Sequence, residues 1–382
     1  MKIYITIDGG TTNTRVNLVK DRQIIDTRKI ARGAKAGIDD KNGLKIALKD
    51  AIRDLLDSNS IGITSAEVGK PSDSATADGE PSDSATAGSE PSDSATVRRI
   101  RESDVIRILA SGMITSEFGL YELPHLTAPA GIKELHDSMA EVSFPEISPI
   151  PFVFIRGIKV NSNNLCDFDM MRGEETELVG IKFLQENSEK KDGNSGEKCG
   201  ISGEKCGISD KSADKSKENE ERIFVLPGSH SKIIRTDSDG RVVGFSTMLT
   251  GEMLMSLSQS TILKDAVDIS IGEFDREHLI WGCKFAIEEG LNKSLFKVRI
   301  LKNAFKANPV QVYSFFVGAV LSDEIHSILS DDCREVVIGG NHQIKEATAT
   351  LIKALSDKSV TTLSDSEVAA STTIGAISIF EY

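Results

Sequence analysis

Residues 2–15 read Lys2-Ile3-Tyr4-Ile5-Thr6-Ile7-Asp8-Gly9-Gly10-Thr11-Thr12-Asn13-Thr14-Arg15. Apolar and polar side chains alternate over residues 2–7, which places the isoleucines on one face and is typical of a strand. A second strand is predicted over residues 14–19, and a third at Ile24 and Ile25. The segment therefore predicts a strand, a loop of small residues and a second strand in close succession.

This loop, residues 8–13, offers the groups that a nucleotide phosphate needs. Its glycines allow close approach of the backbone, and its amide N–H groups and hydroxyls can surround an anion. The residues expected to bind nucleotide here are Gly9, Gly10, Thr11, Thr12 and Asn13. Asp8, at the end of the strand, can hold Mg²⁺ directly or through water. A plain hairpin turn is the alternative, but a turn alone does not require Asp8, two threonines, Asn13 and Arg15 together.

A similar arrangement occurs in the second half of the chain. Residues 223–226 form a short apolar run typical of a buried strand, and a strand resumes at Ile233-Ile234. Between them lies Pro227-Gly228-Ser229-His230-Ser231-Lys232, where Gly228, Ser229 and Ser231 are expected to bind nucleotide. Two such hairpins facing each other form the phosphate clamp of actin-like and sugar-kinase ATPases. The repeat therefore predicts one phosphate loop from each half of the chain.

A charged segment lies between the two loops and reads Met170-Met171-Arg172-Gly173-Glu174-Glu175-Thr176-Glu177-Leu178-Val179-Gly180. It places an arginine, a glycine and three glutamates just before an apolar helical pattern. An ordinary helix start is the alternative, because threonine and acidic residues favour a first helical turn. The phosphate loops on either side of the segment favour a functional interpretation.

Together these segments resemble the 2-dehydro-3-deoxygalactonokinase family of the sugar-kinase and actin-like ATPase superfamily. The matching segments are residues 7–15, Ala110-Ser111-Gly112-Met113-Ile114, residues 171–180, residues 226–232 and Met248-Leu249-Thr250-Gly251-Glu252. Their order and approximate spacing agree from end to end, and Arg-Gly-Glu-Glu-Thr followed by Pro-Gly-Ser-His is the most specific part. The chain departs from the family at Gly9, where a Trp is expected, and in two long insertions.

The resemblance implies an α/β fold: a two-domain actin-like (ribonuclease H-like) ATPase with an interdomain cleft. It implies phosphoryl transfer from ATP, with Mg²⁺, to the 6-hydroxyl of 2-dehydro-3-deoxy-galactonate. The expected general base is Glu174, with Glu175 and Asp169 as rivals because the alignment can slip there. Arg172 is the candidate for the substrate carboxylate, since a guanidinium fork suits it.

Other residues have weaker expected roles. Further candidates for substrate binding are Arg15, Lys232 and His230, and for His230 a purely structural role stays open. Gly339, Gly340 and Asn341 follow a predicted strand at residues 336–338, where the superfamily receives adenosine, although a packing turn is the alternative. A second alternative concerns the whole protein: a kinase of the same fold for another sugar acid or sugar, or a non-catalytic nucleotide-binding sensor.

Composition fits a metabolic enzyme. The 382 residues carry a net charge of −13 with no basic stripe, which argues against nucleic acid and anionic membrane as partners. An anionic substrate then needs a locally positive pocket. The five cysteines and the strand at the N-terminus, with no signal peptide, favour the reducing cytoplasm. The expected ligands are a small sugar acid and ATP, and a homo-oligomer stays open.

Two segments are expected to be disordered insertions, about 69–97 and about 187–221. The first repeats Pro-Ser-Asp-Ser-Ala-Thr at Pro71, Pro81 and Pro91, and neither segment offers the apolar residues that a core requires. The remaining chain is divided into domains at 1–160 and 161–382. Further predicted elements are helices at 44–55, 311–329, 344–355 and 372–380, and strands at 105–109 and 152–155.

Overall fold

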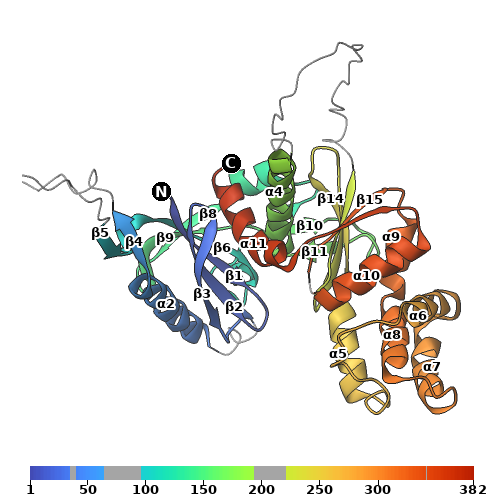
Figure 1. Ribbon diagram of the computed structural model, residues 1–382. Helices are drawn as coiled ribbons and strands as arrows, with labels where there is room; N and C mark the ends of the chain where they lie inside the picture. The colour runs from blue at the N-terminus through green and yellow to red at the C-terminus, as the bar shows by residue number, and fades with distance from the viewer. Residues whose placement is uncertain (35–39, 64–95, 193–220, 341) are drawn as a thin grey trace, which may run out of the picture.

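The computed structural model describes residues 1–34, 40–63, 96–192, 221–340 and 342–382 (Figure 1). A six-stranded sheet forms the first half, in the order β3-β2-β1-β6-β9-β8. The strands are β1 (Ile3–Gly9), β2 (Thr14–Lys20), β3 (Gln23–Ile30), β6 (Val105–Gly112), β8 (Ala140–Phe144) and β9 (Ser148–Phe154). Helix α2 (Lys41–Ser58) packs on β2 and β3. The strands predicted in this half and the helix at 44–55 are confirmed.

The second half repeats the central pairing of the first. Its five-stranded sheet has the order β14-β13-β12-β15-β16. The strands are β12 (Arg222–Leu226), β13 (Ser231–Thr236), β14 (Val242–Met248), β15 (Glu335–Ile338) and β16 (Ser359–Thr362). In both sheets a hairpin supplies a strand that then pairs in parallel with a strand from much later in the chain, β1 with β6 and β12 with β15. The predicted repeat of strand, loop and strand is therefore confirmed.

Two helices lie between the sheets (Figure 1). They are α4 (Glu174–Asp192) and α11 (Asp365–Phe380), and α11 also contacts β1 and β6. They cross closely at two glycines: a Cβ on Gly180 would lie 1.8 Å from the Ser371 carbonyl oxygen, and one on Gly375 would lie 1.8 Å from the Thr176 carbonyl oxygen. A division at residue 160 assigns α11 to the second domain, although this helix packs against the first sheet. The division therefore remains a proposal.

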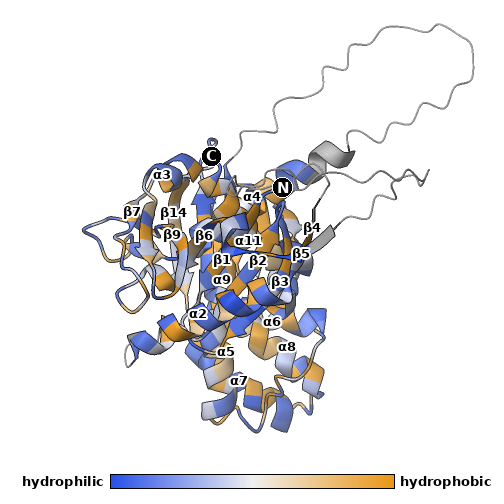
Figure 2. Ribbon diagram, turned by 90° about the vertical axis from the view of Figure 1, so that its left-hand side faces the viewer, coloured by the Kyte–Doolittle hydropathy of each residue, from blue (hydrophilic) through white to orange (hydrophobic). Residues whose placement is uncertain are grey.

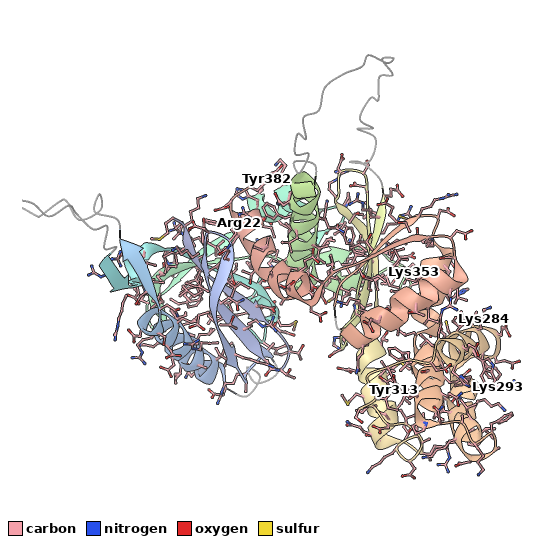
Figure 3. All side chains as sticks on the ribbon, in the orientation of Figure 1. Arg22, Lys284, Lys293, Tyr313, Lys353 and Tyr382 are labelled. Atoms are coloured by element: carbon pink, nitrogen blue, oxygen red, sulfur yellow. The ribbon has the colours of Figure 1, made fainter. Side chains whose placement is uncertain are left out.

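The end of α11 is fixed to the first hairpin. Arg22, which Figure 3 labels near α11, donates from Nη1 to the Ser378 hydroxyl at 2.8 Å and pairs with Glu381. The Tyr4 hydroxyl donates to the same Glu381 carboxylate at 2.9 Å. Apolar residues are frequent in the first sheet and in α11 (Figure 2). The start of β1, which leads to the first loop, is thus anchored by the C-terminal helix.

Five helices between β14 and β15 pack in one core with the second sheet (Figure 1). They are α5 (Thr250–Ser260), α6 (Arg276–Glu289), α7 (Leu291–Asn303), α8 (Pro309–Val320) and α9 (Ser322–Ser330). The single helix predicted over residues 311–329 is wrong, because the chain bends by 51° between α8 and α9. Both helices bury apolar residues in one core, so the hydrophobic pattern runs through the break and does not reveal it. No single helix in the described ranges is long and apolar enough to span a membrane, and only the bent α8–α9 pair passes that test jointly.

The remaining elements are short or terminal. Helix α10 (His342–Leu355) confirms the helix at 344–355, and α11 begins at Asp365, earlier than residue 372, because Ser364 caps it. Strands β7 (Leu126–Thr127), β10 (Ile158–Val160) and β11 (Asp169–Met171) form a small sheet, and β4 (Ser60–Ile63) pairs with β5 (Thr96–Arg99). The short helices are η2 (Glu102–Asp104), η3 (Met113–Thr115) and α3 (Ile132–Asp137).

The expected insertions fall mainly outside the described residues. Helix α4 continues to Asp192, into the range 187–221, and β5 begins at Thr96, within the range 69–97. Residues 64–95 and 193–220, which hold most of both insertions, are not among those that the structure describes.

Candidate active site

A cleft of about 1590 Å³, including the solvent at its mouth, lies where segments distant in sequence meet. Its lining comes from the first loop (Asp8 to Thr11), from residues of the η3–β7 segment between Met113 and His125, from the α4 start (Met170 to Glu174, with Glu177), and from His230, Lys232, Thr247 and Thr372. The cleft therefore brings together the first loop, the charged segment and the end of the second loop.

The first loop is a tight turn supported by close backbone contacts. The Gly10 amide donates to the Asn13 carbonyl at 2.9 Å. A Cβ on Gly9 would lie 2.6 Å from the backbone nitrogen of Ile114, so η3 leaves no room for a side chain at this position. A Cβ on Gly112, whose φ is +81°, would lie 2.5 Å from the Gly9 carbonyl oxygen. The missing Trp at position 9 thus accompanies a backbone that accepts only glycine there.

Glu174 opens α4 and points into the cleft. Its carboxylate accepts a hydrogen bond from the Arg172 amide at 2.9 Å and forms an ion pair with Lys232 Nζ at 2.9 Å. Lys232 is only 4% exposed, so its ammonium group is a buried partner, not a surface charge. Gly173 makes the turn possible with φ +115°. The carboxylate that sequence reasoning favoured as base is therefore held in a fixed position at the cleft.

The two rival carboxylates lie elsewhere. Glu175 is 1% exposed, accepts from the Gly173 amide, and lines a different cavity on the other side of α4. Burial, together with the neighbouring Glu174 charge, raises the pKa of Glu175 to about 8. Asp169 accepts from the Thr247 amide at 2.6 Å and from its hydroxyl at 2.9 Å, which ties β11 to β14. Neither side chain is among those that line the cleft.

Glu177 is a cleft residue that sequence reasoning missed. Its pKa is raised to about 8, by burial first and then by the charges of Glu174 and Asp8. The pKa of Asp8 is raised by burial and by Glu174, and lowered by Arg15. Asp8, Glu174 and Glu177 therefore face one region. Glu177 lies three residues after Glu174 on the same helix, and residues at this spacing share a helix face. This spacing could have indicated that both side chains point into the cleft.

The donor set in this region is compatible with Mg²⁺. Its oxygens are hard ligands, and the charge of Glu174 raises the pKa of both Asp8 and Glu177, so a cation there would relieve this repulsion. Within the described ranges no three His, Cys, Asp or Glu side chains are close enough to form a metal site alone. Mg²⁺ usually binds one or two carboxylates and completes its coordination shell with water and phosphate oxygens. Asp8 could supply such a carboxylate.

Arg172 is engaged with the protein backbone. Its Nη1 donates to the Thr115 carbonyl at 2.7 Å and to the Thr115 hydroxyl at 2.6 Å. Its Nη2 donates to the Leu123 carbonyl at 2.9 Å and contacts His125 Nδ1 at 3.2 Å. These contacts use both ends of the guanidinium fork. Arg15 is exposed on β2 opposite Asp8 and is not among the cleft-lining residues.

The second loop is packed between two glycines. A Cβ on Gly251, at the start of α5, would lie 2.4 Å from the Gly228 carbonyl oxygen, and one on Gly340 would lie 2.3 Å from the Pro227 carbonyl oxygen. The strand-to-helix turn at Gly339 and Gly340 therefore adjoins the loop, as a shared nucleotide site requires. Asn341 lies outside the described residues.

The side chains of the second loop point in different directions. Ser231 is fully buried, on the protein side of the loop. His230 is exposed in the cleft, with Nε2 3.1 Å from the Glu252 carboxylate. Gly228 and Ser229 are not among the residues that line the cleft. Of this loop, His230 and Lys232 are thus the residues that the structure brings to Glu174 and Asp8.

The chain is similar to proteins of one known family. A family model described as 2-keto-3-deoxy-galactonokinase matches residues 8–199 and 201–374. The 2-dehydro-3-deoxygalactonokinase of Escherichia coli (strain K12) is 24% identical over 226 residues, which is 58% of this chain and 61% of that protein. The match therefore spans less than two thirds of the relative's length.

A solved structure has the same fold. It is the crystal structure of a Sinorhizobium meliloti protein to which 2-dehydro-3-deoxygalactonokinase activity has been attributed. Its TM-score is 0.63 at 19% identity, over 99% of this chain and 100% of that one. The predicted α/β actin-like ATPase fold is confirmed. Because the family model covers nearly the whole chain, the protein belongs to the 2-keto-3-deoxy-galactonokinase family.

Proposed function

We propose that the protein is an ATP-dependent sugar-acid kinase that phosphorylates 2-dehydro-3-deoxy-D-galactonate at its 6-hydroxyl, giving the 6-phosphate and ADP. The observation that carries the proposal is Glu174, held by Lys232 and the Arg172 amide in the cleft that the first loop also lines. Phosphoryl transfer requires a positioned acceptor hydroxyl, a phosphate cradle and charge neutralisation. Each has a candidate group in this cleft.

Glu174 would accept the proton of the attacking 6-hydroxyl. Its two contacts orient the carboxylate and leave lone pairs for the hydroxyl, as a general base needs. The amide groups of residues 9–13 would bind phosphate oxygens, with Asp8 as the candidate Mg²⁺ ligand. A bound Mg²⁺ would neutralise phosphate charge in a site that already contains the acidic side chains of Asp8, Glu174 and Glu177.

The nucleotide would extend toward the second loop. A Cβ on Gly340 would meet the Pro227 backbone and one on Gly251 would meet the Gly228 carbonyl, so the backbones of the second loop and of the Gly340 turn form one close-packed surface. We infer that this surface receives the adenosine of ATP. The compartment we propose is the cytoplasm, which agrees with the free thiols of Cys166, Cys283 and Cys333.

The test is ADP release from ATP and Mg²⁺ with a panel of acceptors. The panel contains 2-dehydro-3-deoxy-galactonate, its C4 epimer, other sugar acids, and uncharged sugars. The proposal expects the highest kcat/KM with the galactonate derivative, and the product should carry phosphate on C6 by phosphorus–proton NMR. Preference for another acceptor would assign the same fold a different substrate. ATP binding with no turnover on any acceptor would favour a nucleotide-binding sensor.

A further inference from the structure

His125 lines the cleft in the segment that leads from η3 to β7, and it has no role in the mechanism above. Its Nδ1 lies 3.2 Å from Nη2 of Arg172. A guanidinium group can only donate hydrogen bonds, so Nδ1 must be the acceptor and carries no proton. In the neutral ring the proton then resides on Nε2, which is a donor. Arg172 therefore fixes the tautomer of His125.

The surroundings of the ring decide where this donor points. The Cδ2 edge packs against Gly157, where a Cβ would come within 2.8 Å. Nδ1 contacts Arg172 and Cδ2 lies against Gly157, so the edge formed by Cε1 and Nε2 is the part of the ring that neither contact covers, and His125 lines the cleft.

The backbone of the segment is also held. Arg156 donates from Nη1 to the Pro124 carbonyl at 3.0 Å, and the Leu126 amide donates to the Gly157 carbonyl at 2.9 Å. Arg172 binds the Leu123 carbonyl on the other side. The ring is thus carried by a segment whose backbone is hydrogen-bonded at Leu123, Pro124 and Leu126, as a preorganised binding group requires.

Electrostatics favour an anionic partner for this donor. Burial, followed by the charges of Arg172 and Lys159, lowers the pKa of His125 to about 4. The ring therefore stays neutral at physiological pH. Donation from a cation into Nδ1 polarises the ring and strengthens the Nε2–H donor. An anionic oxygen is the acceptor that such a donor binds best.

We propose that His125 binds the carboxylate of the sugar acid through Nε2–H, and that Arg172 acts through His125 and does not form the carboxylate fork itself. The inference rests on the proposed function, because it names the group that recognises the anionic end of that substrate. Both ends of the Arg172 guanidinium already bind groups of the protein. Through His125, Arg172 can still strengthen binding of the substrate carboxylate.

The test compares two substitutions at one position. In His125→Asn the amide oxygen can still accept from Arg172, but the side chain no longer reaches the position of Nε2. In His125→Gln the amide N–H₂ reaches that position. Steady-state kinetics are measured with the sugar acid and with its uncharged primary amide, after circular dichroism and thermal unfolding show that the variants are folded.

We expect His125→Asn to raise KM for the acid roughly 10- to 100-fold, the range for a lost hydrogen bond to a charged group. KM for ATP should change little, and KM for the amide analogue should rise by a smaller factor, about 2- to 10-fold, because its neutral carbonyl accepts a weaker hydrogen bond than a carboxylate. His125→Gln should keep most of the affinity for the acid. An unchanged KM in His125→Asn, an equal loss with acid and amide, or no difference between the two variants would overturn the inference.

Failure of the proposed function is recognised separately. If the parent enzyme turns over no sugar acid, the proposed function fails, and calorimetric binding of the acid to parent and variants decides the inference. At least tenfold weaker binding to His125→Asn than to parent and His125→Gln would support it. Equal binding, or no binding to the parent, would overturn it.

Discussion

Replacement of Glu174 by Gln tests the centre of the proposed mechanism. The amide has the shape of the carboxylate but cannot accept a proton, and a general base typically contributes about 10²- to 10⁴-fold to the rate. We expect kcat to fall within that range while KM for ATP stays within about twofold, because Glu174 is not proposed to bind nucleotide.

The same substitution should also lower the free energy of unfolding. Lys232 is 4% exposed, and its ammonium lies 2.9 Å from the Glu174 carboxylate, whose side chain is 25% exposed. Loss of a charge-assisted hydrogen bond costs about 1.5–3 kcal/mol, and partial exposure of Glu174 places the expected loss near 2 kcal/mol. For a protein of 382 residues that is a decrease in Tm of roughly 2.5 °C.

A second substitution separates the two effects. The double variant Glu174→Gln with Lys232→Met removes the unpaired buried ammonium, so Tm should recover while kcat stays low. ADP release in a coupled spectrophotometric assay gives kcat, and circular dichroism gives Tm. Glu177→Gln is the matched control: it lies on the same helix face, and since its pKa is raised to about 8 it is largely neutral at pH 7. A Glu174→Gln enzyme within tenfold of the parent kcat, with Asp169→Asn inactive, would refute Glu174 as the base.

Four further predictions follow from the same structure. Asp8→Asn should abolish Mg²⁺-dependent turnover without loss of Tm, because burial already raises the pKa of this carboxyl; near-normal turnover with unchanged Mg²⁺ dependence would contradict the assignment. The pKa of Glu175 is raised from 4.5 to about 8, so this group's stabilising contribution is complete below about pH 4.5 and is lost as pH rises to 8, at about 1.4 kcal/mol per pH unit. Glu175→Gln should therefore flatten the decline of Tm between pH 5.5 and 8.5, and parallel parent and variant curves would show the interpretation to be wrong. Gly9→Ala should lower stability by about 1–3 kcal/mol, since the new Cβ would meet the Ile114 backbone at 2.6 Å; an unchanged denaturation midpoint would argue against that contact. Because Ile63 pairs with Thr96, a two-residue turn in place of residues 64–95 should leave Tm and kcat/KM nearly unchanged, and a chain that no longer folds would show that this segment contributes to stability.

Local sequence was sufficient where a feature depends on neighbours in the chain. The alternation of residues 2–7, the glycines that follow, and their counterpart at residues 223–232 predicted both hairpins and the repeat that relates the two sheets. Glycine-rich turns and period-two strands are set by backbone sterics and by one buried face, and both are visible in a short window. The α4 start was predicted for the same reason.

Local sequence did not predict the break between two helices whose apolar residues follow one helical pattern. The break between α8 and α9 comes at Leu321, just before Ser322-Asp323-Glu324, but apolar residues recur at helical spacing on both sides of it, because both helices bury their faces in one core. The family resemblance indicated the fold and the loops, but it could not assign the contacts of individual side chains.

Tertiary structure decided which charged groups meet. Arg172 and Thr115 are 57 positions apart in sequence, and only folding shows that the arginine is engaged with backbone carbonyls and His125. Glu174 and Glu175 are adjacent in sequence, yet one faces the cleft and the other is buried behind it, because consecutive helical residues point about 100° apart. The sequence by itself thus determined the hairpins, the loops and the family. Long-range packing determined which carboxylate, lysine and histidine share the cleft, because a side chain's partners come from segments that no local pattern connects.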